Sequence, residues 1–449
     1  MPPQFFQPFK LLRQDCVENV DEYKLGGHHP VQIDDTFEDN RYTIIHKLGS
    51  GGFSTVWLAF DAQNNSYVAL KFVIATHSTQ EYDFSKDFDN LFEGSNKGKS
   101  DCQELKIIQY IAENFDEKSK KRLAVEVETF WVQGVNGKHL VFASPVNGPC
   151  LQDYALKVHY SPDFARKITL DAAKALQELH KAGVVHGDFT TRNILLKLHN
   201  LDSLCYEEVE ACFGRVFKEK LLPKRGHFPD RSAPKWIFKE ANMCQIPAKY
   251  IKDEVIIIDF GLSFHASSQP PIDGAGSPYS YRPPEMMNSC EARLFLHTAD
   301  GPSEKLGDKL DIWALACDIF EVRTRNQLFP GCDDNEDTVY SVRDTMAEIW
   351  LEDSEDDWTY MSDKAYDKQE SLRSKIEEEP MSEREKDLFY DLLKKMLKRK
   401  PSHRIGIEEV IQHSWFTTDY DAIEKEEEEE EEEDSARCMR YESEEKAEE

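Results

Sequence analysis

The chain has 449 residues, 40% of them hydrophobic, which is enough for two lobes with a buried core. Its formal net charge of −30 at pH 7 excludes the nucleic-acid backbone as a main ligand, because binding that backbone requires a basic surface. No apolar run is long enough for a signal peptide or a membrane span, and the ten cysteines lack metal-ligand spacing. We therefore expect an intracellular protein with reduced thiols that binds basic partners and neither nucleic acid nor membranes.

Residues 1–41 show no clear helix period and are expected to form an extended arm. Residues 42–73 alternate apolar and polar side chains with turn signals between them, which predicts three strands. The turn between the first two strands contains Gly49, Gly51 and Gly52, with Ser54 where a third glycine often stands. Such a cluster allows the backbone to close over phosphates, although an ordinary hairpin turn is the commoner interpretation.

The third strand ends in Val68-Ala69-Leu70-Lys71. A lysine at this point can clamp phosphates, whereas a single strand lysine is usually only solvated. Strand, glycine turn, strand and lysine in this order resemble the nucleotide loop of protein kinases, and the combination is far more specific than either part.

A polar stretch at 78–100 predicts a loop, and residues 102–115 then follow a helical period. One face of this helix would carry Leu105, Ile108 and either Ile111 or Ala112. Glu104 is the candidate partner for the strand lysine, and the alternative is a surface glutamate.

Residues 138–154 predict a strand and a turn-rich connector. Phe142 would stand at the back of a nucleotide pocket, and the main chain of Ala143–Val146 would meet an adenine edge. Residues 163–183 predict a helix with a strong apolar stripe and Gly183 after its end.

The central stretch is VVHGDFTTRNILL, residues 184–196, which predicts a strand, a loop and a second strand. It places Asp188 five residues before Asn193, so that both polar tips would lie in one cleft. Phosphoryl transfer uses such a pair, because the aspartate handles the substrate hydroxyl proton and the asparagine helps hold a metal ion. Alone, the loop could be an ordinary turn whose aspartate caps a backbone N–H.

Residues 253–264 predict a buried strand that ends in Asp259-Phe260-Gly261, where the aspartate would chelate Mg²⁺. Between this strand and the catalytic loop lies an insertion, residues 197–254, whose structure the sequence leaves open. It is partly basic, with Lys218, Lys220, Lys224, Arg225 and Lys235.

Three further residues have expected structural roles. Glu285 should pair with Arg404, and Asp311, near the start of a buried helix, should cap backbone amides of the catalytic loop. Residues 388–416 complete a helical region, and the run Glu426–Glu433 predicts a disordered acidic tail.

In this order the motifs resemble a eukaryotic protein kinase over residues 42–417. The lead-in YKLGGHHPV, the phrase FSTVWLA, the insertion and a loop lacking arginine before its aspartate are similar to the SR-protein kinases. The resemblance implies an α+β fold of two lobes, an N-lobe at 42–146 and a C-lobe at 147–417, flanked by an extension at 1–41 and a tail at 418–449. It also implies a monomeric serine/threonine kinase of the cytoplasm and nucleus that acts in mRNA splicing regulation.

The same resemblance implies ATP and Mg²⁺ as cofactors and basic Ser/Arg-rich proteins as substrates. Asp188 would be the catalytic base, Lys71 would hold phosphates with Glu104 behind it, and Asn193 and Asp259 would bind the metal. The expected nucleotide-binding residues are Leu48, Gly49, Ser50, Gly51, Gly52, Phe53, Ser54, Val56, Ala69, Lys71, Phe142, Ala143 and Val146.

Two residues depart from the family pattern. Thr190 stands where most serine/threonine kinases have a lysine that faces the transferred phosphoryl group. We expect Arg192 to replace this cation, as an arginine at that offset does in many tyrosine kinases. Gly187 replaces the arginine that usually contacts a phosphorylated activation loop, so activity should not depend on phosphorylation of that loop.

Between Asp333 and Lys386 there are nineteen acidic residues against seven basic ones, which would attract an arginine-rich peptide. A solvated acidic insertion is the competing interpretation, and the glutamate tail is likewise either a solubility tail or a competitor for basic substrates. Two other functions stay open: a pseudokinase scaffold that binds Arg-rich partners, and a small-molecule phosphotransferase or atypical kinase with a His-Gly-Asp loop.

Overall fold

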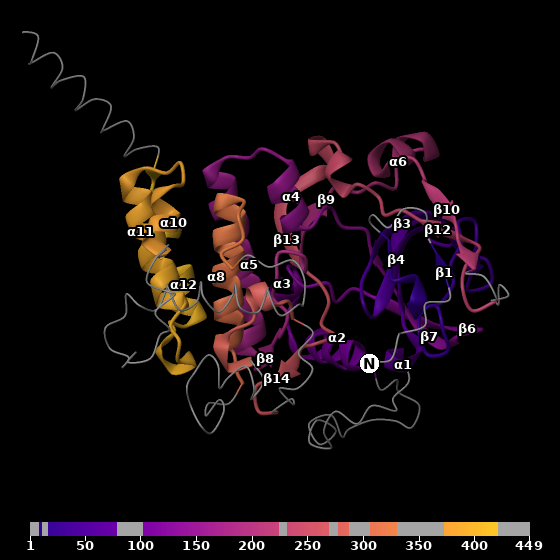
Figure 1. The fold of residues 1–449 in the computed structure, drawn as a ribbon, viewed down its shortest axis with the longest axis horizontal. Coiled ribbons are helices and arrows are strands. Elements are labelled where there is room, and N and C mark those ends of the chain that lie inside the picture. Colours follow the sequence, from indigo (N-terminus) through magenta and orange to yellow (C-terminus); the bar gives the residue numbers. More distant parts are fainter. Residues whose placement is uncertain are drawn as a thin grey trace, which may run out of the picture.

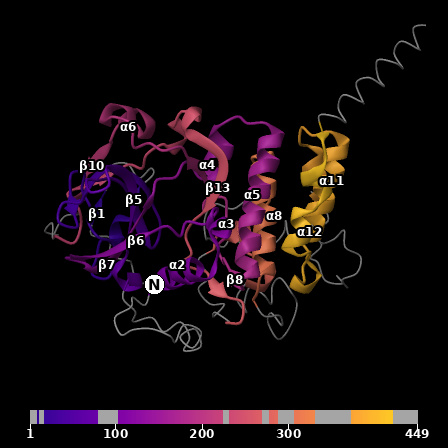
Figure 2. The same cartoon turned by 180° about the vertical axis from the view of Figure 1, so that it is seen from behind.

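The computed structural model describes residues 9–10, 17–78, 102–223, 231–268, 277–286, 306–329 and 372–420. A β-rich lobe and a helical lobe stand side by side, joined by the chain after β7 (Figure 1). The view from behind shows the same division (Figure 2). Within the described residues, no helix combines the length and apolar character needed to cross a membrane.

The N-lobe is one antiparallel sheet of six strands in the order β2-β3-β4-β5-β7-β6. Its strands are β2 Thr36–Phe37, β3 Tyr42–Ser50, β4 Ser54–Asp61, β5 Ser66–Val73, β6 Glu128–Gly134 and β7 Gly137–Pro145. Its helices are α1 Ala75–Ser78, α2 Gln103–Asn114 and α3 Glu117–Lys120. On α2, Ile111 is buried and Ala112 is exposed, which decides between the two residues that the helical period left open.

The described C-lobe consists mainly of helices. These are α4 Leu151–Lys157, α5 Pro162–Lys181, α8 Lys309–Thr324, α10 Leu372–Glu377, α11 Glu383–Met396, α12 Ile407–Ile411 and α13 Ser414–Thr417. Two short antiparallel pairs carry the loops of the site: β8 Val184–Val185 with β14 Phe264–His265, and β9 Ile194–Leu198 with β13 Ile251–Ile257.

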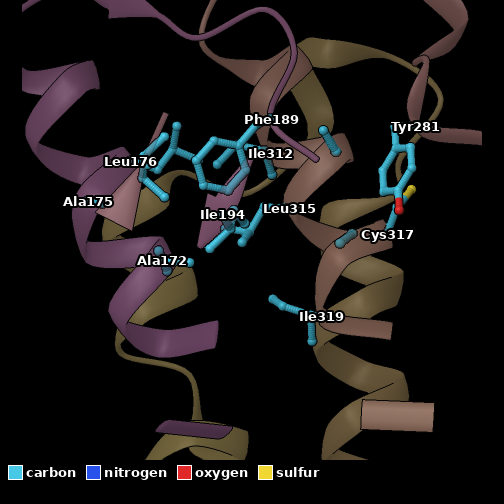
Figure 3. Packing of buried hydrophobic residues seen from close by; sticks show 14 of the residues in the cluster. Ala172, Ala175, Leu176, Phe189, Ile194, Tyr281, Ile312, Leu315, Cys317 and Ile319 are labelled. Atoms are coloured by element: carbon cyan, nitrogen blue, oxygen red, sulfur yellow. The ribbon is translucent and has the colours of Figure 1, made fainter. Parts of the chain in front are cut away.

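The longest C-lobe helix, α5, has clear boundaries. The hydroxyl of Ser161 accepts from the amide of Phe164, Pro162 occupies the first turn, and Gly183 takes a φ of +71° beyond the end. The neighbouring helix α8 is buried from Leu310 to Thr324, because it runs through the middle of the lobe. Figure 3 shows apolar residues of α5 and α8 meeting around Phe189 and Ile194, so the catalytic loop is seated on the main core.

Four segments differ from or add to the sequence predictions. Residues 17–41 do not form a free arm, because β2 belongs to the sheet and Tyr23 and Val31 are buried. The connector after β7 contains the helix α4, and β6 had no prediction. The insertion folds into α6 Tyr206–Phe213, β10 Lys218–Lys220, β11 Leu222–Pro223 and β12 Trp236–Phe238, where β10 pairs with β12, and β11 with β1 Phe9–Lys10.

Some expectations lie outside the described residues. These are residues 79–100 of the loop predicted at 78–100, Lys224 and Arg225 of the insertion, most of the acidic stretch that begins at Asp333, and the glutamate tail. Ser78, the first residue of the predicted loop, is instead the last residue of α1. The cysteines of the described part, at positions 102, 150, 205, 212, 244 and 317, are all free thiols.

Candidate active site

A lysine and two carboxylates from three separate elements meet at the junction of the lobes. Lys71 lies on β5, Glu104 in the first turn of α2, and Asp259 two residues after β13. The ammonium Nζ of Lys71 donates to both Glu104 oxygens at 2.7 and 2.8 Å and to Asp259 Oδ1 at 3.1 Å. Burial alone lowers the pKa of Lys71, but the charges of Asp259 and Glu104 raise it above its ordinary value, so the lysine stays charged.

The backbone of Asp259 is in the left-handed region, with a φ of +63°. This conformation is uncommon for a residue other than glycine and costs free energy, so it persists where the surroundings hold it. Asp259 Oδ1 accepts the Lys71 ammonium and, at 3.4 Å, the amide of Gly261. The side chain is 44% exposed, so the carboxylate is also accessible to a ligand.

Asp188 and Asn193 face each other across the catalytic loop. The Asn193 Nδ2 group donates to the backbone oxygen and to Oδ2 of Asp188, both at 2.9 Å. Oδ1 of Asp188 is buried and has no hydrogen-bond partner among the described residues. Burial and the nearby charge of Asp259 raise the pKa of Asp188 to about 6, which leaves a carboxylate suited to accept a proton.

Through its residue Asp311, the helix α8 holds the backbone of the loop that carries Asp188. Asp311 accepts the backbone amides of His186 at 2.8 Å and Gly187 at 3.0 Å, as the sequence predicts. Gly187 has a φ of +80°, and a Cβ there would lie 2.5 Å from the carbonyl oxygen of Leu262. The glycine is therefore required by the close approach of the Asp259–Gly261 loop.

Sequence reasoning missed a group of polar residues beneath Asp188. The side chain of Ser277 is near enough to Asp188 to act to lower its pKa. Thr191 Oγ1 lies 2.8 Å from the Tyr281 hydroxyl and 2.8 Å from Glu321 Oε2, and Tyr281 also donates to Glu321. The available signal was the run of hydroxyl side chains in GSPYSY just before the Pro-Pro-Glu motif.

That motif forms the expected ion pair, with Arg404 on Glu285 at 2.6 and 2.7 Å.

The glycine turn between β3 and β4 closes as a hairpin, with Gly51 N donating to Ser54 O at 2.9 Å. A Cβ on Gly49, Gly51 or Gly52 would meet no atom within 4 Å, so open space lies over the turn. Beneath the turn, Val56, Lys71 and Phe142 occupy adjacent strands in register, and Ala69 lies opposite Ser144. Phe142 and Ala143 are buried, and Phe53 at the tip is 51% exposed.

Two expected nucleotide-binding residues have an additional neighbour. Leu48 and Val146 are partly buried against an apolar cluster that includes Leu201, Val209 and Phe213 of the insertion. The insertion therefore packs along the edge of the predicted adenine pocket.

Thr190, which departs from the kinase pattern, and Arg192, the expected replacement for the missing lysine, differ in exposure to solvent. Thr190 is buried, and Arg192 is exposed. Burial raises the pKa of Cys150, the residue before α4, to about 11. The positive charge of Arg192 acts against this rise. The replacement of the missing lysine by Arg192 stays a prediction.

The side chains fit a magnesium ion. Among the described residues, no group of three His, Cys, Asp or Glu side chains could enclose a metal by itself. Mg²⁺ usually needs only one or two protein oxygens, because substrate phosphates and water supply the others. Asp259 and the Oδ1 of Asn193, whose Nδ2 is already used, offer two such oxygens.

Comparison with known proteins gives one consistent family. The protein kinase domain family matches residues 42–205 and 238–416. SRSF protein kinase 3 of Homo sapiens is 32% identical over 240 residues, 52% of this chain and 36% of that protein. Protein kinase dsk1 of Schizosaccharomyces pombe is 26% identical over 384 residues, 70% of this chain and 66% of that protein.

The serine/threonine-protein kinase spk-1 of Caenorhabditis elegans is 33% identical over 198 residues, 42% of this chain and 18% of that protein. The matched segments span 18% of spk-1, 36% of SRSF protein kinase 3 and 66% of dsk1, which is less than two thirds of each of these relatives. A solved kinase domain superposes with a TM-score of 0.50 at 16% identity, covering 87% of this chain and 98% of its own, which supports the two-lobed fold. With its fold, its motif order and the family match in agreement, this chain belongs to the protein kinase domain family, and its distant homologues are SR-protein kinases.

Proposed function

We propose that the chain is a serine/threonine protein kinase that uses Mg²⁺ and ATP to phosphorylate serines in basic, Ser/Arg-rich protein segments. The observation that carries the proposal is the three-element contact of Lys71 with Glu104 and Asp259, 3.1 Å at its longest. The contact holds a cation beside a metal-binding carboxylate, with the Asp188–Asn193 pair next to it.

Each side chain has a defined task in this proposal. Lys71 binds nucleotide phosphates, and Glu104 keeps its ammonium in place. Asn193 and Asp259 would hold Mg²⁺, which would supply positive charge to neutralise the phosphates when bound. The carboxylate of Asp188 accepts the proton of the substrate hydroxyl while the hydroxyl oxygen bonds to the γ-phosphorus and the bond from this phosphorus to the β-phosphate oxygen breaks, releasing ADP.

Charge supports the proposed substrate class. Arginine-rich peptides would be attracted by a chain of net charge −30, and most strongly near the acidic stretch from Asp333 to Lys386. A single surface contact is worth only about 0–1 kcal/mol, so the affinity would come from several contacts along an extended peptide. One relative, SRSF protein kinase 3 of Homo sapiens, is by its name a kinase of SRSF proteins.

Transfer of radiolabelled phosphate from ATP to an arginine–serine repeat peptide tests the proposal. We expect Mg²⁺-dependent labelling of serine by the parent chain and none by Asp188→Asn. Labelling of a matched tyrosine peptide, or of a small metabolite instead of the serine peptide, would contradict the proposed substrate class.

A pseudokinase scaffold is the second candidate, and Thr190 in place of the usual lysine favours it. Such a scaffold would bind the arginine–serine peptide in an equilibrium titration without transferring phosphate to it. Phosphate transfer that Asp188→Asn abolishes excludes the scaffold. The small-molecule phosphotransferase is less supported, because the buried Glu285–Arg404 pair belongs to the protein kinase pattern.

A further inference from the structure

The insertion crosses from the C-lobe to the strand that leads into the glycine turn. It leaves the C-lobe at β9 and returns at β13, which pair with each other. Between these strands, α6, β10 and β12 lie beside β3 and β4 of the N-lobe (Figure 1). Residues 206–237 fall between the two ranges that match the kinase family, so this part is an addition to the common domain.

Three contacts join the insertion to the end of β3 and its neighbour. The amide of Ala241 donates to the carbonyl of Lys47 at 2.9 Å. The hydroxyl of Ser50, the last residue of β3, donates to Glu240 Oε1. The ring of Phe238 packs edge-on against Trp57 of β4, with centroids 5.8 Å apart.

The N-terminal segment supports the same strand. Lys47 is fully buried and forms an ion pair with Glu18, which also accepts the hydroxyl of Tyr23. A buried lysine without such a partner would be strongly destabilising, so Glu18 is needed to keep Lys47 in the strand. The strand before the glycine turn is thus held by two segments, and one of them reaches the turn itself through Glu240.

We propose that Glu240 is a positioning residue for the glycine turn and thereby for the nucleotide phosphates. Such an anchor matters here because glycine backbones are conformationally free and no atom lies within 4 Å of the Cβ positions of Gly49, Gly51 and Gly52. By binding the Ser50 hydroxyl, Glu240 restrains the position of the following backbone amides relative to the phosphates. The turn is then already ordered before ATP binds, so binding loses less conformational entropy. The proposal rests on the proposed binding of ATP.

Equilibrium titration of the full chain with Mg·ATP tests this role without requiring phosphate transfer. Glu240→Ala and Ser50→Ala should each weaken ATP binding by about tenfold, the value of one hydrogen bond to a charged acceptor. The double variant should be no weaker than either single variant, because both changes remove the same contact. Glu240→Gln keeps an acceptor and should recover most of the affinity.

Asp202→Ala is the matched control. It removes a hydrogen bond of the same insertion, from Asp202 Oδ1 to the amide of Tyr67 at 3.0 Å, away from the glycine turn. We expect this variant to lower the melting temperature and to leave the affinity for ATP unchanged.

The outcomes separate the two ideas. A double variant whose losses add, or Glu240 and Ser50 variants that change only the melting temperature, would overturn the positioning role while leaving ATP binding intact. A parent chain that does not bind Mg·ATP at all would overturn the proposed function and the positioning role with it.

Discussion

At the scale of single residues, the site is assembled from groups whose ionisation is set by their neighbours. Asp188 is the clearest case, since burial and the charge of Asp259 raise its pKa from 3.8 to about 6. Between these two pH values the folded protein holds a proton that the unfolded chain has released, so stability falls as the pH rises through this window. Above pH 6 the full cost of the ionised carboxylate is present. The environment that imposes this cost also brings the pKa of Asp188 close to the working pH, which suits a general base.

Asp188→Asn should therefore stabilise the protein while it abolishes activity. A shift of two pKa units corresponds to at most about 3 kcal/mol, and we expect a gain of about 1–2 kcal/mol at pH 7. Denaturant unfolding at pH 7 and at pH 4.5 measures it, and the gain should be smaller at the lower pH. A variant that is less stable than the parent at pH 7 would show that Asp188 is a structural acceptor instead of a strained base.

Arg192 carries the second prediction at this scale. If it supplies the cation missing at Thr190, Arg192→Ala should lower kcat about a hundredfold, the usual effect of losing one transition-state donor, with little change in the KM for ATP. Thr190→Lys in the same chain should restore part of the rate. Arg215→Ala, an exposed cation of the insertion, serves as the control. If Arg192→Ala leaves kcat unchanged, a cation other than Arg192 stabilises the transferred phosphoryl group.

At the scale of elements, sequence reasoning was successful where a local pattern also fixes a contact. The strands β3 to β5 and the helix α2 follow from their periods, and the helix α8 from the stretch KLDIWALACDIFEV, which indicates a buried helix. Glu104 and Asp311 lie where these elements put them. The insertion has no such period, so neither α6 nor the β10–β12 pair could be predicted. Ser50 and Glu240 are 190 positions apart, and nothing local in the sequence indicates their contact.

The helix α8 carries a prediction of its own, because its first turn supports the catalytic loop. Asp311→Ala leaves the buried amides of His186 and Gly187 without an acceptor, and each such loss costs about 1–3 kcal/mol. Denaturation should show a loss of several kcal/mol together with a fall in kcat. Asp308→Ala at the same helix end is the control, since Asp308 makes no side-chain capping bond. Equal effects in both variants would mean that the helix end, and not the loop contact, is responsible.

At the scale of the whole molecule, each lobe contains a buried ion pair that joins two of its segments. The buried pairs Glu18–Lys47 and Glu285–Arg404 lie in different lobes, and each would leave an uncompensated charge if one partner were removed. The family pattern predicted the second pair and not the first. Glu18 precedes the kinase domain, and its partner Lys47 looks like an ordinary strand lysine in the sequence.

The net charge of −30 leads to a prediction about substrates. If attraction by surface acids supplies the affinity, the KM for an arginine–serine peptide should rise steeply with salt, because charges beyond about 8 Å are screened at physiological ionic strength. A peptide with glutamine in place of arginine should show a higher KM and little salt dependence. Steady-state kinetics at about 50 and about 300 mM KCl provides the comparison, because this roughly sixfold rise in ionic strength shortens the Debye length about 2.4-fold.

Deleting residues 424–449 then locates the acids that matter. A tail that competes for basic peptides would raise the apparent KM, so its removal should lower the KM at low salt and have no effect at high salt. If the KM is unchanged by the deletion, the attraction belongs to the helical lobe and the tail is not a competitor. A KM that is insensitive to both salt and deletion would contradict electrostatic recognition altogether, and substrate choice would then depend on contacts close to Asp188.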